Sequence, residues 1–149
     1  MRLDVMTSPS QKATSQPERV KNYRVLVVED APDTRELLRL LFEAEGYEVL
    51  TAGDGLSAVE MALRELPDAI VMDMSLPGLD GYNAAKLIRR EPALADVPLI
   101  ACTAFNRWEW GGKAIAAGFD AFLTKPIDVR RLSATVSSLL SRRSDRIAR

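Results

Sequence analysis

From residue 23 onward, short apolar runs alternate with helical patterns, and this alternation constrains the fold more than any other feature of the chain. The runs are rich in Val, Ile and Leu and do not alternate strictly with polar residues, as expected of strands that are buried on both faces. They lie at residues 23–28, 47–51, 69–72, 97–102 and 121–123. The pattern predicts an α/β fold with (βα)5 order, a doubly wound five-stranded parallel sheet with right-handed crossovers.

Between the runs, apolar residues recur with the spacing of an amphipathic helix. The predicted stripes are Leu37, Leu38, Leu41 and Ala44 in the first helix, Val59, Ala62, Leu63 and Leu66 in the second, and Val129, Leu132, Val136 and Leu139 in the last.

Polar residues and glycines mark where these helices begin and end. Asp54 and Asp80 are expected N-caps of the second and third helices. Asp33 and Glu36 have the spacing of a capping box at the start of the first helix. Glycines stop helices because they accept a left-handed backbone, so Gly46 and Gly118 are expected to end the first and fourth helices.

Length and composition favour a single folded domain. The chain has 149 residues, which suits one domain with a real core. Residues 1–22 are polar and lack periodicity, so we expect a disordered arm there. We expect one domain over residues 23–141 and a short basic tail over residues 142–149.

Several function classes are disfavoured by what the chain contains. The net charge of −1 gives no field that favours nucleic acid or an anionic membrane. The apolar runs are too short to span a bilayer, and the N-terminus has no signal core. A single cysteine fits a reducing compartment, so we expect a cytoplasmic protein. The absence of histidine excludes histidine acid–base chemistry, histidine metal ligands and a phosphohistidine on this chain.

Polar residues follow four of the five predicted strands. Glu29-Asp30, Asp73, Thr103 and Lys125 all stand at carboxyl ends. Doubly wound sheets bind ligands beyond these ends, so the side chains are expected to meet. Adjacent carboxylates suit Mg²⁺, one directly and one through water. The set therefore predicts a site that holds a divalent cation and a phosphoryl group.

Each of these residues also has an ordinary interpretation. Asp73 alone could cap the turn before Pro77-Gly78, Glu29-Asp30 could be acids at a helix start, and Lys125 could lie on the surface. In combination they favour Asp73 as a nucleophile that forms a phosphoryl intermediate. Mg²⁺ and Lys125 would then stabilise the charge on the phosphoryl oxygens.

The motifs, in this order and spacing, resemble the receiver domain of two-component response regulators. They are Val28-Glu29-Asp30, the segment Val71-Met72-Asp73-Met74-Ser75-Leu76-Pro77-Gly78, Thr103-Ala104 and Phe122-Leu123-Thr124-Lys125-Pro126. The resemblance covers residues 23–141. It implies a flavodoxin-like sheet with strand order 2-1-3-4-5.

The resemblance also implies a role for each site residue. Asp73 matches the phosphoacceptor, Asp30 the direct Mg²⁺ ligand, and Glu29 the second acid, acting through water. Ser75 matches the residue whose backbone carbonyl binds the metal, and Lys125 the lysine that pairs with the phosphoryl group. Two further residues match the switch of the family, Thr103 with its hydroxyl and Phe122 with its ring. Glu29 replaces a more usual aspartate, and Phe122 lacks the hydroxyl that a tyrosine would use.

The implied function is phosphorelay signalling by a stand-alone receiver. The phosphoryl donor would be a histidine kinase or a histidine phosphotransfer protein. A downstream protein would bind the face made by the fourth helix, the fifth strand and the fifth helix. We expect neither a nucleic acid nor a membrane partner. We expect a monomer or a weak homodimer. We also expect no external substrate, so the chain would not be an enzyme. Trp108 and Trp110, two residues apart, cannot both face a helix core, so at least one is expected to be exposed.

Alternatives remain at this point. A phosphatase or phosphotransferase with an aspartyl-phosphate intermediate would need an acid two residues after the nucleophile, where this chain has Ser75. A flavodoxin-like FMN carrier would have its phosphate repelled by Glu29-Asp30. A degenerate receiver that only binds partners would not need the intact acids and Lys125. The chain could also be a receiver fragment of a larger regulator or hybrid kinase.

Overall fold

The computed structural model describes residues 22–104 and 115–148, and its centre is a five-stranded parallel sheet. The spatial order is β3-β2-β4-β5-β6, which is the predicted 2-1-3-4-5 order when strands are counted along the chain. The strands are β2 (Arg24–Val28), β3 (Glu48–Ala52), β4 (Ala69–Asp73), β5 (Leu99–Thr103) and β6 (Ala121–Thr124). The predicted fold class and strand order are therefore confirmed.

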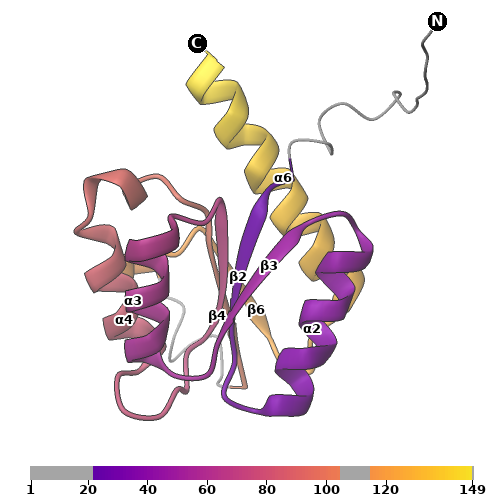
Figure 1. Ribbon diagram of the computed structural model, residues 1–149, viewed down its shortest axis with the longest axis vertical. Coiled ribbons are helices and arrows are strands. Elements are labelled where there is room, and N and C mark those ends of the chain that lie inside the picture. The colour runs from indigo at the N-terminus through magenta and orange to yellow at the C-terminus, as the bar shows by residue number, and fades with distance from the viewer. Residues whose placement is uncertain (1–21, 105–114, 149) are drawn as a thin grey trace, which may run out of the picture.

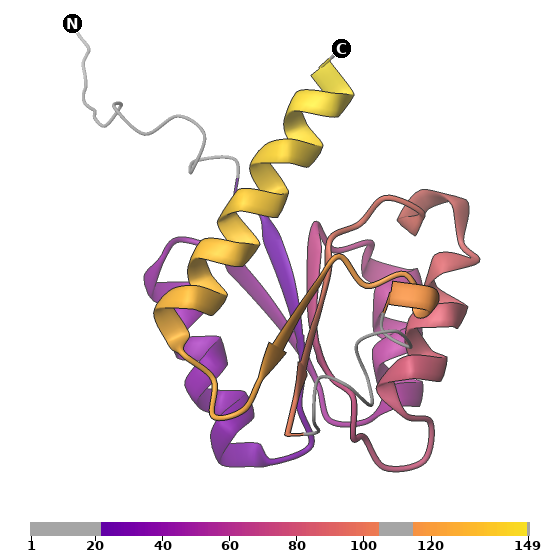
Figure 2. The same cartoon turned by 180° about the vertical axis from the view of Figure 1, so that it is seen from behind.

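Helices cover both faces of the sheet (Figure 1). α3 (Gly55–Glu65) and α4 (Gly81–Arg89) pack on one face, and α2 (Pro32–Ala44) and α6 (Val129–Ala148) on the other, as the reverse view in Figure 2 also shows. A short 3-10 helix, η2 (Pro92–Leu94), follows α4. Every residue of β4 and of β5 is buried. This two-sided burial explains why the strands are apolar without alternation.

The helix boundaries confirm most of the predicted signals. The Asp54 carboxylate accepts a hydrogen bond from the Ser57 amide at 2.7 Å, and Asp80 accepts one from the Asn83 amide at 2.8 Å, so both cap their helices. Gly46 ends the first helix with φ of +98°. Gly118, with φ of +99°, follows residues 115–117, which are helical.

The predicted capping box at Asp33 and Glu36 is wrong. The first helix begins at Pro32, Ala31 is its N-cap, and no side chain caps it. Proline is favoured at the first helical position because it has no amide hydrogen to leave unpaired. Pro32 therefore places Asp33 inside the first turn instead of ahead of it.

Part of each predicted apolar stripe is exposed. Leu37 is 59% exposed and Leu66 is 48% exposed, whereas Leu38 and Phe42 in α2 are buried. In α3 the residues that meet the core are smaller, namely Gly55, Ala58, Val59 and Ala62. A side chain at Gly55 would collide with the Leu79 carbonyl, since its Cβ would lie 1.8 Å from that oxygen. Because α3 packs this closely against the neighbouring backbone, small residues occupy its buried face. The leucines of α3 lie on its exposed face.

The C-terminal helix is longer than the sequence indicated. We expected a tail from residue 142, but α6 continues to Ala148 and projects past the edge of the sheet at which the strands begin (Figures 1 and 2). Two contacts anchor the extension. The hydroxyls of Tyr23 and Ser144 lie 2.7 Å apart, and the Arg143 guanidinium donates to the Asp68 carbonyl at 3.1 Å.

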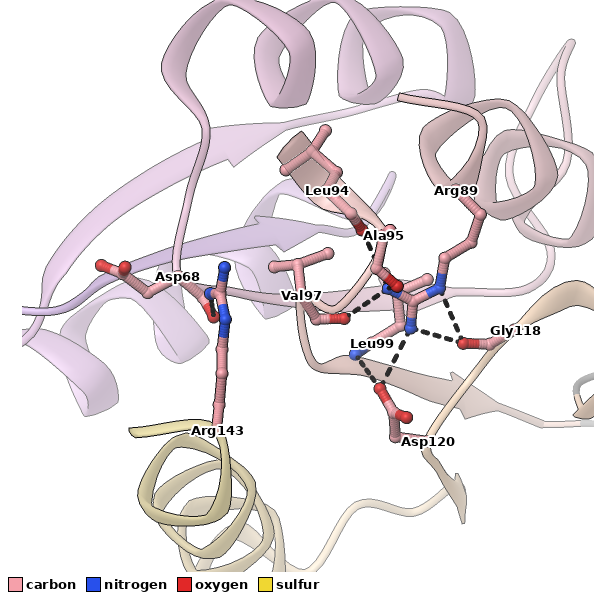
Figure 3. A network of polar contacts seen from close by, with 9 residues as sticks. All are labelled: Asp68, Arg89, Leu94, Ala95, Val97, Leu99, Gly118, Asp120 and Arg143. Atoms are coloured by element: carbon pink, nitrogen blue, oxygen red, sulfur yellow. Dashed lines mark hydrogen bonds and ion pairs between the residues drawn. The ribbon is translucent and has the colours of Figure 1, made fainter. Parts of the chain in front are cut away.

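Arg89, at the end of α4, connects the segments that precede β5 and β6 (Figure 3). These segments lie at the edge where the strands begin, whereas the predicted site residues follow the strand ends. The Arg89 guanidinium donates to the carbonyls of Leu94, Val97 and Gly118 at 3.0, 2.7 and 2.6 Å. It also pairs with the Asp120 carboxylate at 3.1 Å, and Asp120 accepts from the Leu99 amide at 2.9 Å. Burial lowers the pKa of Arg89 although Asp120 raises it. The Arg89 guanidinium thus donates hydrogen bonds to several acceptors at once.

Two expectations fall on residues that the structure does not describe. The N-terminal arm, apart from Asn22, and the pair Trp108 and Trp110 lie outside the described residues. Within residues 22–104 and 115–148, no helix has both the length and the apolar character needed to cross a membrane.

Candidate functional site

The predicted site residues meet at the edge where the parallel strands end. Glu29 and Asp30 directly follow β2, Asp73 is the last residue of β4, and Thr103 is the last of β5. Lys125 directly follows β6. The sheet places β2, β4, β5 and β6 side by side, so residues from four distant segments converge on one place.

Three carboxylates form the centre of this site. Glu29, Asp30 and Asp73 each offer an oxygen, and these oxygens all lie within 4.8 Å of one another. Glu29 and Asp73 are almost fully buried, at 3% and 5% exposure, and Asp30 is exposed. Like charges this close repel, and a buried carboxylate is costly without compensating charge. Hard oxygen ligands in such a cluster suit Mg²⁺, so the cluster could hold that ion.

Lys125 supplies a compensating charge from the chain itself. Its ammonium lies 2.9 Å from the Asp73 carboxylate and 3.1 Å from the Glu29 carboxylate. Burial alone would lower the pKa of Lys125, but hydrogen bonds to Asp73 and Glu29 outweigh it and the pKa is raised. The peptide bond between Lys125 and Pro126 is cis.

Main-chain amides orient the two buried carboxylates. Asp73 accepts from the Ser75 amide at 2.9 Å through the oxygen that does not contact Lys125. Glu29 likewise accepts from the Ala31 amide at 3.0 Å. Each buried carboxylate therefore has one oxygen on Lys125 and the other on the backbone. The Ser75 amide was not anticipated from the sequence, which singled out the Ser75 carbonyl.

The remaining predicted residues, Thr103 and Phe122, lie on β5 and β6. Thr103 is fully buried, and its carbonyl accepts from the Lys125 amide at 2.7 Å. Phe122 lies in β6, where it is half-buried and packs against the core beneath α3 and α4. Cys102, next to Thr103, is also buried; burial, with a smaller influence from Asp73, raises the pKa of its thiol to about 12. A thiol of that kind is inert, so Cys102 is a core residue.

Arg35 also contacts the site, which the sequence analysis did not foresee. Its guanidinium donates to the Glu29 carbonyl at 2.8 Å from the beginning of α2. The sequence gives little indication of this contact, because an arginine five residues after Asp30 is ordinary on an exposed helix face.

Fold and site together define a class of protein. A doubly wound parallel sheet with an acidic cluster and a lysine at its carboxyl edge is the arrangement of a protein that binds a cation and an anionic group at that edge. The comparison with known families is specific, since residues 25–137 match the response regulator receiver domain. The chain belongs to this family, and it is a receiver domain of two-component phosphorelay signalling.

Curated relatives include both short and long response regulators. The chain is 36% identical over 124 residues to the "DNA-binding dual master transcriptional regulator RpaA" of Synechocystis, spanning 83% of this chain and 51% of that protein. It is 40% identical to the response regulator PleD of Caulobacter vibrioides, over 78% of this chain and 26% of that one. It is 36% identical to the polar-differentiation response regulator DivK of Brucella anthropi, over 78% of this chain and 94% of that one.

Solved structures agree. A response regulator from Chloroflexus aurantiacus superimposes with a TM-score of 0.76 at 32% identity, covering 80% of this chain and 98% of that one. The receiver domain of a sensor histidine kinase from Pseudomonas aeruginosa, which holds a magnesium ion in its active-site cleft, gives a TM-score of 0.75 at 33% identity with the same coverage. The chain thus spans about half of RpaA, a quarter of PleD and nearly all of DivK.

Proposed function

We propose that this chain accepts a phosphoryl group on Asp73 from the phosphohistidine of a histidine kinase or a histidine phosphotransfer protein. The observation that carries the proposal is the position of the Asp73 carboxylate, at a strand end, 2.9 Å from Lys125 and within 4.8 Å of two further acids. An Asp73 oxygen would form a bond to phosphorus while the bond from phosphorus to the donor imidazole nitrogen breaks, and the imidazole would leave with that electron pair.

Asp30 and Asp73 would bind Mg²⁺ directly, Glu29 would act through water, and the Ser75 carbonyl would complete the protein ligands. A bound Mg²⁺ would neutralise charge on the transferring group. Lys125 now pairs with the carboxylates and would pair with a phosphoryl oxygen after transfer. Thr103 would donate its hydroxyl to another phosphoryl oxygen, and Phe122 would change its packing in response.

The proposal extends to how the domain works in the cell. The chain acts as a cytoplasmic receiver domain. It catalyses only its own phosphorylation and dephosphorylation, and it has no external substrate. A downstream protein binds the face that includes β6 and the start of α6. We propose a monomer or weak homodimer.

Acetyl phosphate labelling tests the central claim. The wild type should gain one base-labile phosphoryl group, only with Mg²⁺, and mass spectrometry should locate it on Asp73. Asp73→Asn should not be labelled, whereas Asp96→Asn, which removes an exposed carboxylate away from the site, should be labelled normally. A phosphoryl group on Ser75 or Thr103, or full labelling of Asp73→Asn, would refute the assignment.

A Mg²⁺ titration tests the metal ligands. Binding by the wild type should be weak, in the submillimolar to millimolar range, because few protein ligands bind Mg²⁺ here and it keeps several of its waters. Asp30→Asn should weaken it clearly. Equal affinity in both proteins would remove Asp30 from the site.

A further inference from the structure

Asp30 differs from the other two acids of the site in how it is held. Within the described residues, the carboxylates of Glu29 and Asp73 each accept hydrogen bonds from Lys125 and from a main-chain amide. The exposed Asp30 carboxylate accepts none from any residue in that part of the chain. The direction in which Asp30 points therefore depends on the backbone that carries it.

That backbone is held from two sides. The Glu29 carbonyl belongs to the peptide unit that joins Glu29 to Asp30, and the Arg35 guanidinium donates to it at 2.8 Å. On the other side of the same residue, the Glu29 amide donates to the Ala52 carbonyl at 3.1 Å, at the end of β3. A peptide unit is planar, so fixing its oxygen restricts the rotation that would turn Asp30 away from the cluster.

Gly53 leaves the space that the Arg35 guanidinium occupies. A Cβ built on Gly53 would lie 3.0 Å from Nη1 of Arg35, the atom that donates to Glu29. The backbone of Gly53 is not in the left-handed region, so its conformation does not require glycine. The closeness of the guanidinium gives a reason for a residue without a side chain at this position.

We infer that Arg35 is a positioning residue for the metal site, which orients Asp30 through the Glu29 carbonyl, and that Gly53 makes room for it. This inference rests on the proposed function, because it assumes that Asp30 is a direct ligand. Groups that orient metal ligands typically change metal affinity by about 10–100-fold when they are removed.

The charge of Arg35 by itself predicts the opposite change in Mg²⁺ affinity, which makes the inference testable. A guanidinium near a cation site repels the cation, so charge alone predicts that Arg35→Met binds Mg²⁺ more tightly. Loss of positioning predicts weaker binding. Arg39→Met is the matched control, because Arg39 lies one turn further along α2 and, within the residues that the structure describes, bonds only to Glu36 and Glu43.

The experiment is a Mg²⁺ titration followed by backbone amide NMR, on wild type, Arg35→Met and Arg39→Met. We expect about a tenfold loss of Mg²⁺ affinity in Arg35→Met and near wild-type affinity in Arg39→Met. The amides of Asp30 and Ala31 should shift in Arg35→Met before any metal is added, while urea unfolding should show that the variant remains folded. Unchanged or tighter Mg²⁺ binding by Arg35→Met would overturn the inference.

A second pair of variants tests the link through Gly53. Gly53→Val should displace the guanidinium and weaken Mg²⁺ binding in the wild-type background, and it should have no further effect in the Arg35→Met background. Additive effects would show that the two residues act separately and would contradict the inference. If the wild type itself shows no Mg²⁺ binding that depends on Asp30, the proposed function fails first; if it does and Arg35→Met matches it, only the inference fails.

Discussion

The ammonium of Lys125 lies 2.9 Å from the carboxylate of Asp73, although the two residues are 52 positions apart in the chain. The same ammonium reaches Glu29 at 3.1 Å, so one positive charge serves two buried carboxylates. The two buried carboxylates therefore depend on Lys125 for charge balance.

Lys125→Met should destabilise the protein in the absence of metal. It leaves the Glu29 and Asp73 carboxylates close together without their cation, and breaking such a pair costs on the order of 3 kcal/mol. Saturating Mg²⁺ should restore part of the loss, because the ion binds the folded state. Urea unfolding with and without Mg²⁺ measures both effects, and Lys86→Met, which removes an exposed lysine over the Tyr82 ring, is the control. A stability equal to that of the wild type without Mg²⁺ would contradict this account.

Thr103→Ala should separate phosphorylation from the surface response. The variant should still be labelled on Asp73, but the change in amide exchange over residues 115–124 caused by beryllofluoride should be lost. A hydrogen bond to a charged group contributes about 1.5–3 kcal/mol, so the response of the wild type should be partial. Thr103→Ser keeps the hydroxyl and should retain the response; if Thr103→Ala retains it as well, the coupling follows another route.

Arg89→Met should be strongly destabilising. The Arg89 side chain is 18% exposed, and its guanidinium donates to the carbonyls of Leu94, Ala95, Val97 and Gly118, as Figure 3 shows. Removing it leaves several of these carbonyls unpaired, which we expect to cost about 3 kcal/mol in urea unfolding. Arg90→Met removes the neighbouring exposed arginine and should change little. Similar losses in the two variants would show that the network is not the cause.

Cys102 should resist alkylation in the folded protein. Its pKa is raised to about 12, so the folded state keeps the thiol protonated at pH 8. Iodoacetamide should modify it only after unfolding in denaturant, and rapid modification under native conditions would show that the residue is accessible.

The raised pKa of Cys102 also predicts a pH dependence of stability. The unfolded thiol loses its proton near pH 8.5, whereas the folded thiol keeps it, so the contribution is intact below about pH 8.5 and falls above it, by at most about 1.4 kcal/mol per pH unit. Comparing urea unfolding of the wild type and Cys102→Ala between pH 8 and pH 10 isolates this contribution. If the free energy of unfolding declined equally in both proteins, other groups would be responsible for the pH dependence.

The sequence by itself determined the order of strands and helices along the chain and which polar side chains meet at the edge where the strands end. Short Val, Ile and Leu runs without polar alternation, separated by helical patterns, are typical of strands covered on both faces by helices. In a parallel sheet every strand ends at the same edge, so Glu29, Asp30, Asp73 and Lys125 had to meet once the strands were located.

Only the tertiary structure decided the contacts that depend on how elements approach one another. Arg35 reaches the Glu29 carbonyl and Arg89 reaches the Gly118 carbonyl because the packing of their helices brings a flexible side chain to a particular main-chain oxygen. Nothing in the residue types marks such an acceptor, since every residue carries a carbonyl. The length of α6 was decided in the same way, because its last turns are polar and are held by Tyr23 and Asp68, the residues directly before β2 and β4.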